Sequence, residues 1–187
     1  EEDALRKPDS VGRPVFHADV KIIDHQGRSC DTGQVGEIVV RGSIMMTEYW
    51  QDPVKSEETI RGGWLHTGDL ARMDEDGYFY LIDRKRDMYI SGGENVYPAE
   101  VERVLRSHIG IEDIAVVGVP DERWGEVGCA FVIPKQGVTL AAEDVIGFCE
   151  GTLARDKWPE KVIFTSDFPL TALGKVRKTA LKQDYLG

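Results

Sequence analysis

The sequence predicts an α+β protein in which a β-rich first part is followed by a mixed part. Up to about residue 82, apolar and polar residues alternate over short segments that glycine-rich turns separate, which is typical of strands. After Arg86 the pattern changes to helical segments between buried strand candidates. The length of 187 residues allows one or two domains. We therefore place a domain boundary near residues 84–86.

Short strands account for most of the first part. The candidates cover residues 15–24, 37–41, 70–73 and 78–82. The last two flank Asp74-Glu75-Asp76-Gly77, which is a strong hairpin signal. Residues 53–60 form a helix candidate, because Pro53 is tolerated in the first turn of a helix.

The second part alternates helices with strands. The helix candidates cover residues 98–108, 141–153 and 175–182, and the strand candidates cover residues 114–119, 128–133 and 161–165. Pro98 begins the first helix, and early acidic residues favour it. Gly147 and Gly151 weaken the second helix, because glycine has a low helix propensity.

Composition and charge exclude several classes of protein. The net charge of −10 argues against nonspecific nucleic-acid binding, which needs a positive surface. No apolar run approaches the roughly 18 residues that a membrane span needs, and no secretory signal opens the sequence. Cys30, Cys129 and Cys149 are too few and too widely spaced for a disulfide framework or a metal site. We expect a cytoplasmic protein with reduced cysteines.

The basic residues are concentrated at two places. One cluster is Arg84-Lys85-Arg86, and the other comprises Lys175, Arg177, Lys178 and Lys182. In an acidic protein, two local cationic clusters favour a small anionic ligand rather than a polymer.

Four short motifs occur in one order along the chain. They are Trp64-Leu65-His66-Thr67-Gly68-Asp69-Leu70, Asp83-Arg84-Lys85-Arg86-Asp87, Ser91-Gly92-Gly93-Glu94-Asn95 and Leu170-Thr171-Ala172-Leu173-Gly174-Lys175-Val176. Together they resemble the C-terminal portion of the adenylate-forming enzymes, and most of all the fatty-acid and long-chain acyl-CoA ligases. The resemblance implies that residues 1–84 end a large AMP-binding domain in a small β-barrel-like segment. It also implies that residues 85–187 form its mobile C-terminal lid.

Asp69 and Arg84 are candidates for nucleotide binding. A carboxylate fixed in a turn can accept two hydrogen bonds from a vicinal diol, as acids do for nucleotide riboses. A guanidinium can clamp ribose or phosphate oxygens with its planar donors. The alternatives are a turn aspartate that bonds its own backbone and a solvated charge run. The family resemblance assigns both residues to the ribose and makes Arg86 the hinge between the domains.

The paired glycines Gly92 and Gly93 allow a thin ligand to approach the backbone closely. The segment lacks the Gly-Lys-Ser/Thr ending of a triphosphate-binding loop, so the alternative is a simple turn before the next helix. The resemblance implies that this loop lines the tunnel for the pantetheine arm of CoA, together with Trp124. A tryptophan is otherwise more often part of a core.

Lys175 is the candidate catalytic residue. A carboxylate that attacks an anionic α-phosphate is repelled by it, and a compact ammonium that contacts both groups offsets this repulsion. An isolated Gly-Lys is more often a surface charge. The spacing of Thr171 and Gly174, and the upstream motifs in order, favour the catalytic role that the resemblance implies.

The implied reaction has two steps: a carboxylic acid and ATP give an acyl-adenylate and pyrophosphate, and the thiol of CoA then displaces AMP. Mg²⁺ would bridge the phosphates, but no ligands for it are identifiable. The family's phosphate loop and acyl pocket should precede Glu1, so we expect this fragment to fold but to be inactive alone. Two alternatives are an adenylation domain that loads a carrier-protein pantetheine and a non-catalytic ligand-binding module.

Overall fold

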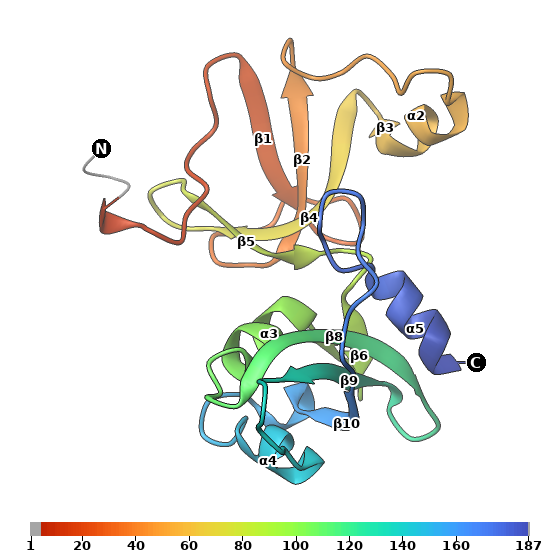
Figure 1. Cartoon of the computed structure of the whole chain (residues 1–187). Helices are drawn as coiled ribbons and strands as arrows, with labels where there is room; N and C mark the ends of the chain where they lie inside the picture. Colours follow the sequence, from red (N-terminus) through yellow and green to blue (C-terminus); the bar gives the residue numbers. More distant parts are fainter. Residues whose placement is uncertain (1–4, 187) are drawn as a thin grey trace. The chain divides into compact units, whose positions relative to one another are not determined.

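The computed structural model describes residues 5–186, which form two compact units that divide between Arg86 and Asp87. The first unit is a curled antiparallel sheet with one short helix, and the second is a sheet covered by helices (Figure 1). The predicted α+β class is confirmed. No helix in residues 5–186 is long and apolar enough to cross a membrane.

The sheet of the first unit is organised around its longest strand, β4. The strands are β1 (Ala18–Ile23), β2 (Gly36–Gly42), β3 (Ile60–Arg61), β4 (Trp64–Met73) and β5 (Phe79–Arg84). β2 pairs with one edge of β4 along most of its length, while β3 and β5 pair with the two ends of the other edge. Helix α2 (Pro53–Thr59) leads into β3, and the Asp52 carboxylate caps it by accepting from the Lys55 amide at 3.0 Å.

A bulge interrupts the pairing of β2 with β4. Glu37 lies opposite Leu70 and Val39 lies opposite His66, so β4 advances four residues while β2 advances two. The extra length is taken up in Thr67-Gly68-Asp69. Gly68 has φ of +72°, a conformation that glycine adopts without steric cost. The glycine of this motif is therefore required by the backbone of the bulge.

The turn between β4 and β5 is fastened by the N-terminal segment. The Lys7 ammonium pairs with the carboxylates of Asp74 and Asp76 and lies 4.6 Å from the centre of the Tyr78 ring. The hydrogen bond from Lys7, with others from the Tyr78 amide and the Tyr80 hydroxyl, holds the pKa of Asp74 well below its usual value. The predicted hairpin at this turn is confirmed.

The sheet of the second unit has β9 at its centre. Its strands are β6 (Tyr89–Ser91), β7 (Glu94–Val96), β8 (Ile111–Asp121), β9 (Gly125–Pro134) and β10 (Pro159–Phe164). β9 is antiparallel to β8 and parallel to β10. Its α-helices are α3 (Pro98–Leu105), α4 (Ala142–Gly147) and α5 (Lys178–Leu186).

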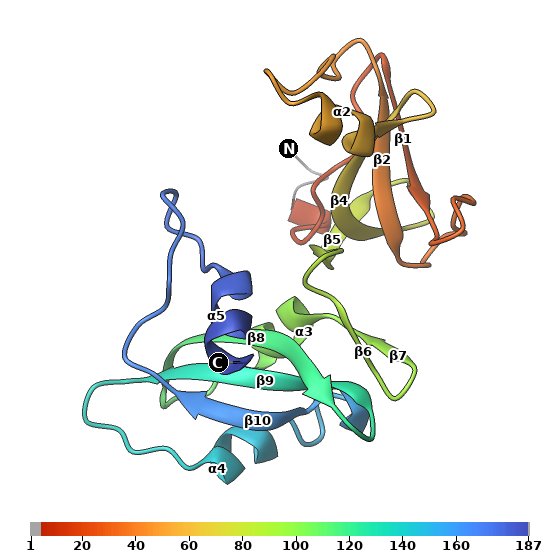
Figure 2. The ribbon, with the colours of Figure 1, turned by 90° about the vertical axis from the view of Figure 1, so that its right-hand side faces the viewer.

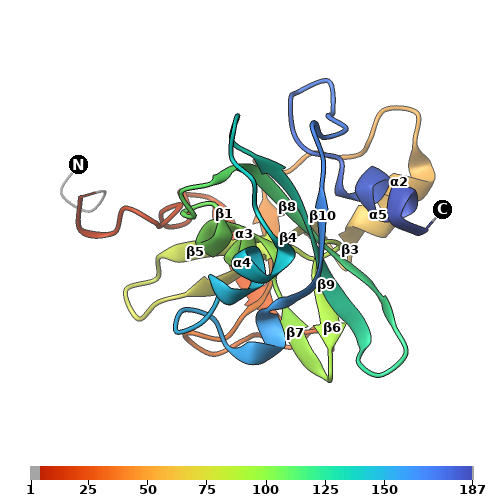
Figure 3. The same cartoon turned by 60° about the horizontal axis from the view of Figure 1, so that its bottom comes forward.

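Successive side chains of β8 point to opposite faces of this sheet, so each face has its own hydrophobic core. Ile114 and Val116 pack with residues of α3 and α4, whereas Ala115 and Val117 pack with Leu181 of α5. Figure 2 shows α4 and α5 on opposite sides of the strands, and Figure 3 shows α3 and α4 close together. The burial of β8 on both faces explains its nearly continuous apolar sequence.

Three predicted elements differ from the structure. The helix predicted over residues 141–153 ends at Gly147, where glycine and the following turns stop it. The helix predicted over residues 175–182 begins only at Lys178, because Leu170 and Val176 form a bridge that closes a turn before it. The segment around Gly92 and Gly93 forms the tip of the β6–β7 hairpin rather than a simple loop.

Tyr89 occupies a slot that two glycines leave open in the sheet. Gly118 of β8 and Gly128 of β9 lie opposite each other in the register. A Cβ atom at Gly118 would lie 2.3 Å from the Tyr89 Cβ, and one at Gly128 would lie 2.5 Å from its hydroxyl oxygen. Burial raises the pKa of the Tyr89 hydroxyl, which has no hydrogen-bond partner in residues 5–186.

We predict that Gly118→Ala lowers the stability of the second unit by about 1–3 kcal/mol, because an overpacked core must shift to relieve the clash. Calorimetric unfolding of the chain measures this loss. Gly147→Ala is the matched control, since its Cβ meets nothing within 4 Å and alanine favours a helix. Equal unfolding temperatures for Gly118→Ala and the parent chain would show that Tyr89 does not fill this slot.

Candidate active site

The pairing of β4 with β5 brings Asp69 and Arg84 together. The two residues are partners in the β4–β5 register, and the Arg84 Nε lies 2.8 Å from the Asp69 Oδ1. Beside them is a hollow of about 330 Å³. Its lining residues are Thr67, Gly68, Arg84, Lys85 and Arg86. The structure thus joins the two residues that the sequence analysis assigned to a nucleotide ribose.

The Asp69 carboxylate does not serve its own turn. The Asp69 amide donates a hydrogen bond to the Thr67 hydroxyl at 3.1 Å and not to the carboxylate of Asp69. The side chains of Asp69 and Arg84 are 28% and 52% exposed, so a ligand can reach both. An accessible carboxylate can accept hydrogen bonds from a diol, and the guanidinium beside it can donate to neighbouring oxygens.

Arg86, the predicted hinge residue, is the last residue of the first unit. The preceding residue is held to that unit, since the Lys85 amide donates to the Gly68 carbonyl at 2.8 Å. The Lys85 ammonium also reaches the buried carboxylate of Glu37. Sequence reasoning missed Glu37. Its only signal was an acidic residue at the start of an apolar strand.

Gly92, Gly93 and Trp124 meet at the β6–β7 hairpin. Gly92 and Gly93 have φ of +59° and +93° and form its two-residue turn. The Gly92 amide donates to the Trp124 carbonyl at 3.0 Å, and a Cβ at Gly92 would lie 3.0 Å from the Trp124 ring. The β8–β9 turn holds Trp124 in place, because the Asp121 carboxylate accepts from its amide at 3.0 Å.

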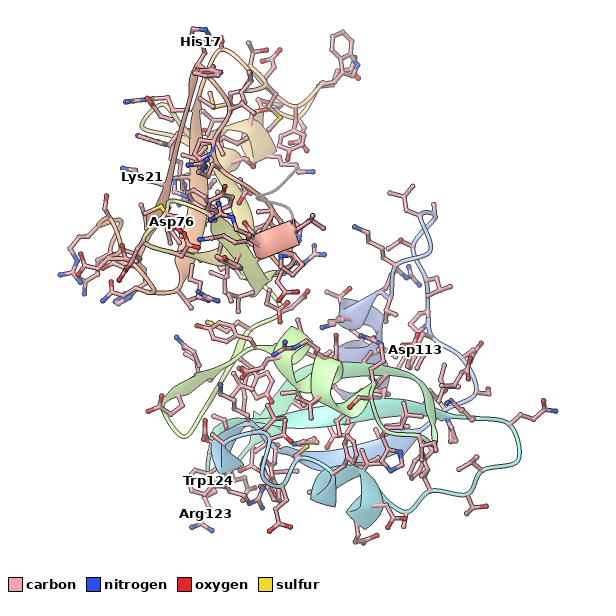
Figure 4. All side chains as sticks on the ribbon, turned by 90° about the vertical axis from the view of Figure 1, so that its left-hand side faces the viewer. His17, Lys21, Asp76, Asp113, Arg123 and Trp124 are labelled. Carbon is pink, nitrogen blue, oxygen red and sulfur yellow. The ribbon has the colours of Figure 1, made fainter. Side chains whose placement is uncertain are left out.

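A pocket of about 270 Å³ lies beside this hairpin. Trp124 and Trp158 are among its lining residues, and so are Arg155 and three carboxylates, namely Glu94, Asp156 and Glu160. Arg155 pairs with Glu160 at 3.3 Å. Figure 4 shows Arg123 next to Trp124, and the guanidinium carbon of Arg123 lies 4.5 Å from the centre of that ring. The pocket therefore combines apolar indole surfaces with an excess of negative charge.

Lys175 lies in a closed turn rather than at the start of a helix. The Thr171 amide donates to the Lys175 carbonyl at 2.7 Å, and the Lys175 amide donates to the Thr171 hydroxyl at 3.1 Å. Gly174 has φ of +77°, which this turn requires. Thr171 and Gly174 thus fix the backbone that presents the exposed Lys175 side chain.

Part of the C-terminal basic cluster is used in docking α5. Lys178 pairs with the buried Glu102 of α3 at 2.7 Å, and Lys182 pairs with Glu126 of β9 at 2.9 Å. In the described part of the chain, the Lys175 ammonium has neither an ion pair nor a hydrogen bond. It is therefore available to an anionic ligand.

The described residues offer no metal centre. No group of at least three His, Cys, Asp or Glu side chains in residues 5–186 is placed to hold an ion.

The family of this chain is shown by comparison with known proteins. A family model described as AMP-binding enzyme matches residues 1–50, and one described as AMP-binding enzyme C-terminal domain matches residues 100–175. The chain belongs to this family of adenylate-forming enzymes.

Relatives and solved structures match nearly the whole chain. The chain is 46% identical to the indoleacetate–CoA ligase of Aromatoleum aromaticum over 97% of its length. It is 42% identical to a long-chain-fatty-acid–CoA ligase of Mycobacterium tuberculosis over 98%. In both cases it spans 36% of the relative. The structure of o-succinylbenzoate CoA synthetase from Bacillus subtilis with its acyl-adenylate intermediate is 36% identical, with a TM-score of 0.89 over 97% of this chain and 37% of that one.

We predict that Lys178→Gln lowers the free energy of unfolding of the second unit by about 3 kcal/mol, because it breaks an ion pair with Glu102 whose two side chains are 17% and 12% exposed. Chemical unfolding of the chain measures the loss. Lys182→Gln on the same helix is the matched control. Its ion pair with Glu126 is 34–40% exposed, so its loss costs less than about 1 kcal/mol. Equal effects of the two substitutions would contradict this docking role for Glu102.

Proposed function

We propose that this chain is the C-terminal part of an ATP-dependent acyl-CoA ligase. The observation that carries the proposal is the accessible Asp69–Arg84 pair at the bulge of β4. The unpaired Lys175 ammonium on its closed turn supports it. Because the chain spans only 36% of the length of the relatives named above, the whole enzyme would include a preceding AMP-binding domain. The 187 residues alone would not form an adenylate.

In the first step, a carboxylate oxygen attacks the α-phosphorus of ATP, and the bond to the bridging oxygen of pyrophosphate breaks. Asp69 and Arg84 hold the ribose, so that the α-phosphate has a fixed position. Lys175 contacts the carboxylate and the α-phosphate and offsets the repulsion between these two anions. Pyrophosphate leaves, and the acyl-adenylate remains bound.

In the second step, the thiol of CoA loses its proton to solvent and its sulfur attacks the acyl carbon. The carbon–oxygen bond to the phosphate breaks, and AMP leaves with one oxygen of the original carboxylate. Gly92, Gly93 and Trp124 would line the path of the pantetheine arm, which is thin enough to pass a glycine turn. Arg86, at the end of the first unit, would absorb the backbone rotation between the two steps.

We assign a fatty or related hydrophobic acid as the substrate class. Of the relatives above, two are named for indoleacetate and long-chain fatty acids, which join an apolar body to a carboxylate, and one for o-succinylbenzoate, an aromatic dicarboxylate. Mg²⁺ would neutralise the phosphates of ATP when bound. A cytoplasmic location agrees with three free cysteines, two of them buried.

One observation favours a second function, the loading of a carrier-protein pantetheine. The pocket beside Gly92 and Trp124 has three carboxylates, and its arginine pairs with one of them. Such a surface repels free CoA, with its 3′-phosphate and diphosphate, more strongly than a protein-bound phosphopantetheine, which carries a single phosphodiester. Faster acyl transfer to a carrier protein than to CoA, with no competition by adenosine 3′,5′-bisphosphate, would favour this function.

We predict that Lys175→Ala in the complete enzyme reduces acid-dependent release of AMP from ATP by a factor of about a hundred or more, because a preorganised cation is lost. The assay supplies ATP, CoA and a series of carboxylic acids. Lys182→Ala is the matched control from the same basic cluster.

The outcomes separate the candidate functions. Release that depends on the acid and collapses only in Lys175→Ala supports the ligase. Equal release by both variants would make Lys175 a surface charge. No release from the parent enzyme with any acid would favour a non-catalytic ligand-binding module.

A further inference from the structure

Glu37 is a buried acid that none of the steps above uses. It lies at the start of β2, and its side chain is only 7% exposed. Burying a carboxylate is costly unless it is paired and hydrogen-bonded. A buried acid beside a ligand-binding turn therefore needs a structural reason, and its contacts supply one.

The Glu37 carboxylate joins three parts of the first unit. Its Oε2 accepts from the Lys85 ammonium at 2.8 Å and lies 3.4 Å from the His66 Nδ1. Its Oε1 accepts from the backbone amide of Gly68 at 3.2 Å. These partners belong to β4, to the bulge within β4 and to the residue that follows β5.

The contact with Glu37 gives the Gly68 amide a hydrogen-bond acceptor that the interrupted ladder does not provide. Residues in a bulge lose their regular ladder bonds. The Gly68 amide donates to Glu37, and the Gly68 carbonyl accepts from the Lys85 amide at 2.8 Å. The amide and the carbonyl of Gly68 are thus both held by hydrogen bonds. This fixes the backbone directly before Asp69.

The contact with Lys85 extends the same fixation to Arg84. Lys85 immediately follows Arg84, and both its amide and its ammonium are bonded to the β4–β2 region. The pair is unequally buried, because Lys85 is 50% exposed. Burial raises the pKa of Glu37, but hydrogen bonds from Lys85 and His66 outweigh this effect and lower it, so the carboxylate is charged at neutral pH.

We propose that Glu37 is a positioning residue of the nucleotide site, which holds the Thr67–Asp69 bulge and Lys85 in one arrangement so that Asp69 and Arg84 face the ribose together. This inference rests on the proposed function. It assigns to Glu37 an effect on the recognition of the ribose hydroxyls rather than a contact with ATP.

The test compares ATP with 2′-deoxy-ATP in the complete enzyme. Glu37→Gln preserves the shape of the side chain and an oxygen for the Gly68 amide, but it removes the charge that holds Lys85. The parent enzyme is expected to prefer ATP by at least about tenfold in kcat/KM, because a hydroxyl that donates to a charged carboxylate forms a strong hydrogen bond. In Glu37→Gln, kcat/KM for ATP should fall by about tenfold and that for 2′-deoxy-ATP by less than about twofold.

A merely structural role would not change this preference, since general damage lowers both values together. Asp19→Asn is the matched control in the same sheet, because it removes an ion pair with Arg41 that is exposed. Lys85→Gln provides a second variant in case Glu37→Gln does not fold. It breaks the same pair from the half-exposed side and should reduce the preference similarly. In the double variant the two losses should not add.

The possible failures are distinguishable. If the parent enzyme releases no AMP with any acid, the proposed function and this inference both fall. If the parent is active and Glu37→Gln or Lys85→Gln retains the full preference for ATP, only the positioning role of Glu37 is overturned. Loss of preference in both variants, but not in Asp19→Asn, supports it.

Discussion

The candidate nucleotide site depends on the extra residues that β4 carries opposite β2. The bulge takes residues 67–69 out of the ladder with β2 on one edge of β4. On the other edge Asp69 stays paired with Arg84 of β5, so the two side chains meet. Such a bulge is stable only if its backbone groups are bonded, and the Thr67 hydroxyl, Lys85 and the buried Glu37 carboxylate provide those bonds.

The second unit presents the ammonium of Lys175 on a backbone turn that hydrogen bonds define. Its sheet is covered on both faces, and α5 is fastened to it by Leu181 and by the pairs Lys178–Glu102 and Lys182–Glu126. The closed turn at Thr171 and Gly174 then precedes a firmly held helix. Neighbouring lysines thus differ in ways that the sequence alone would not separate: Lys178 and Lys182 dock α5, while Lys175 is exposed and is proposed to contact a ligand.

The sequence motifs predicted the candidate site residues, whereas the buried partner Glu37 and the ends of two helices became known only from the structure. Asp69, Arg84 and Lys175 could be singled out because each stands in one of the ordered motifs that resemble the adenylate-forming enzymes. Glu37 could not, because an acid beside apolar residues in a strand reads as a solvent-facing position until its partners are known. The ends of the helices at Gly147 and Lys178 were also missed, since the turns that set them depend on local hydrogen bonds. The β6–β7 hairpin was hidden by the shortness of its strands.

The central claim is that the complete enzyme activates a carboxylate by joining it to the AMP portion of ATP as an acyl-adenylate. It is tested most directly by supplying the acid labelled with ¹⁸O in both carboxylate oxygens, together with ATP and CoA, and by analysing the nucleotide product by mass spectrometry. The account predicts that each AMP carries one ¹⁸O, because the oxygen that attacked the α-phosphorus leaves with it. Unlabelled AMP, or ADP with labelled phosphate, would contradict it.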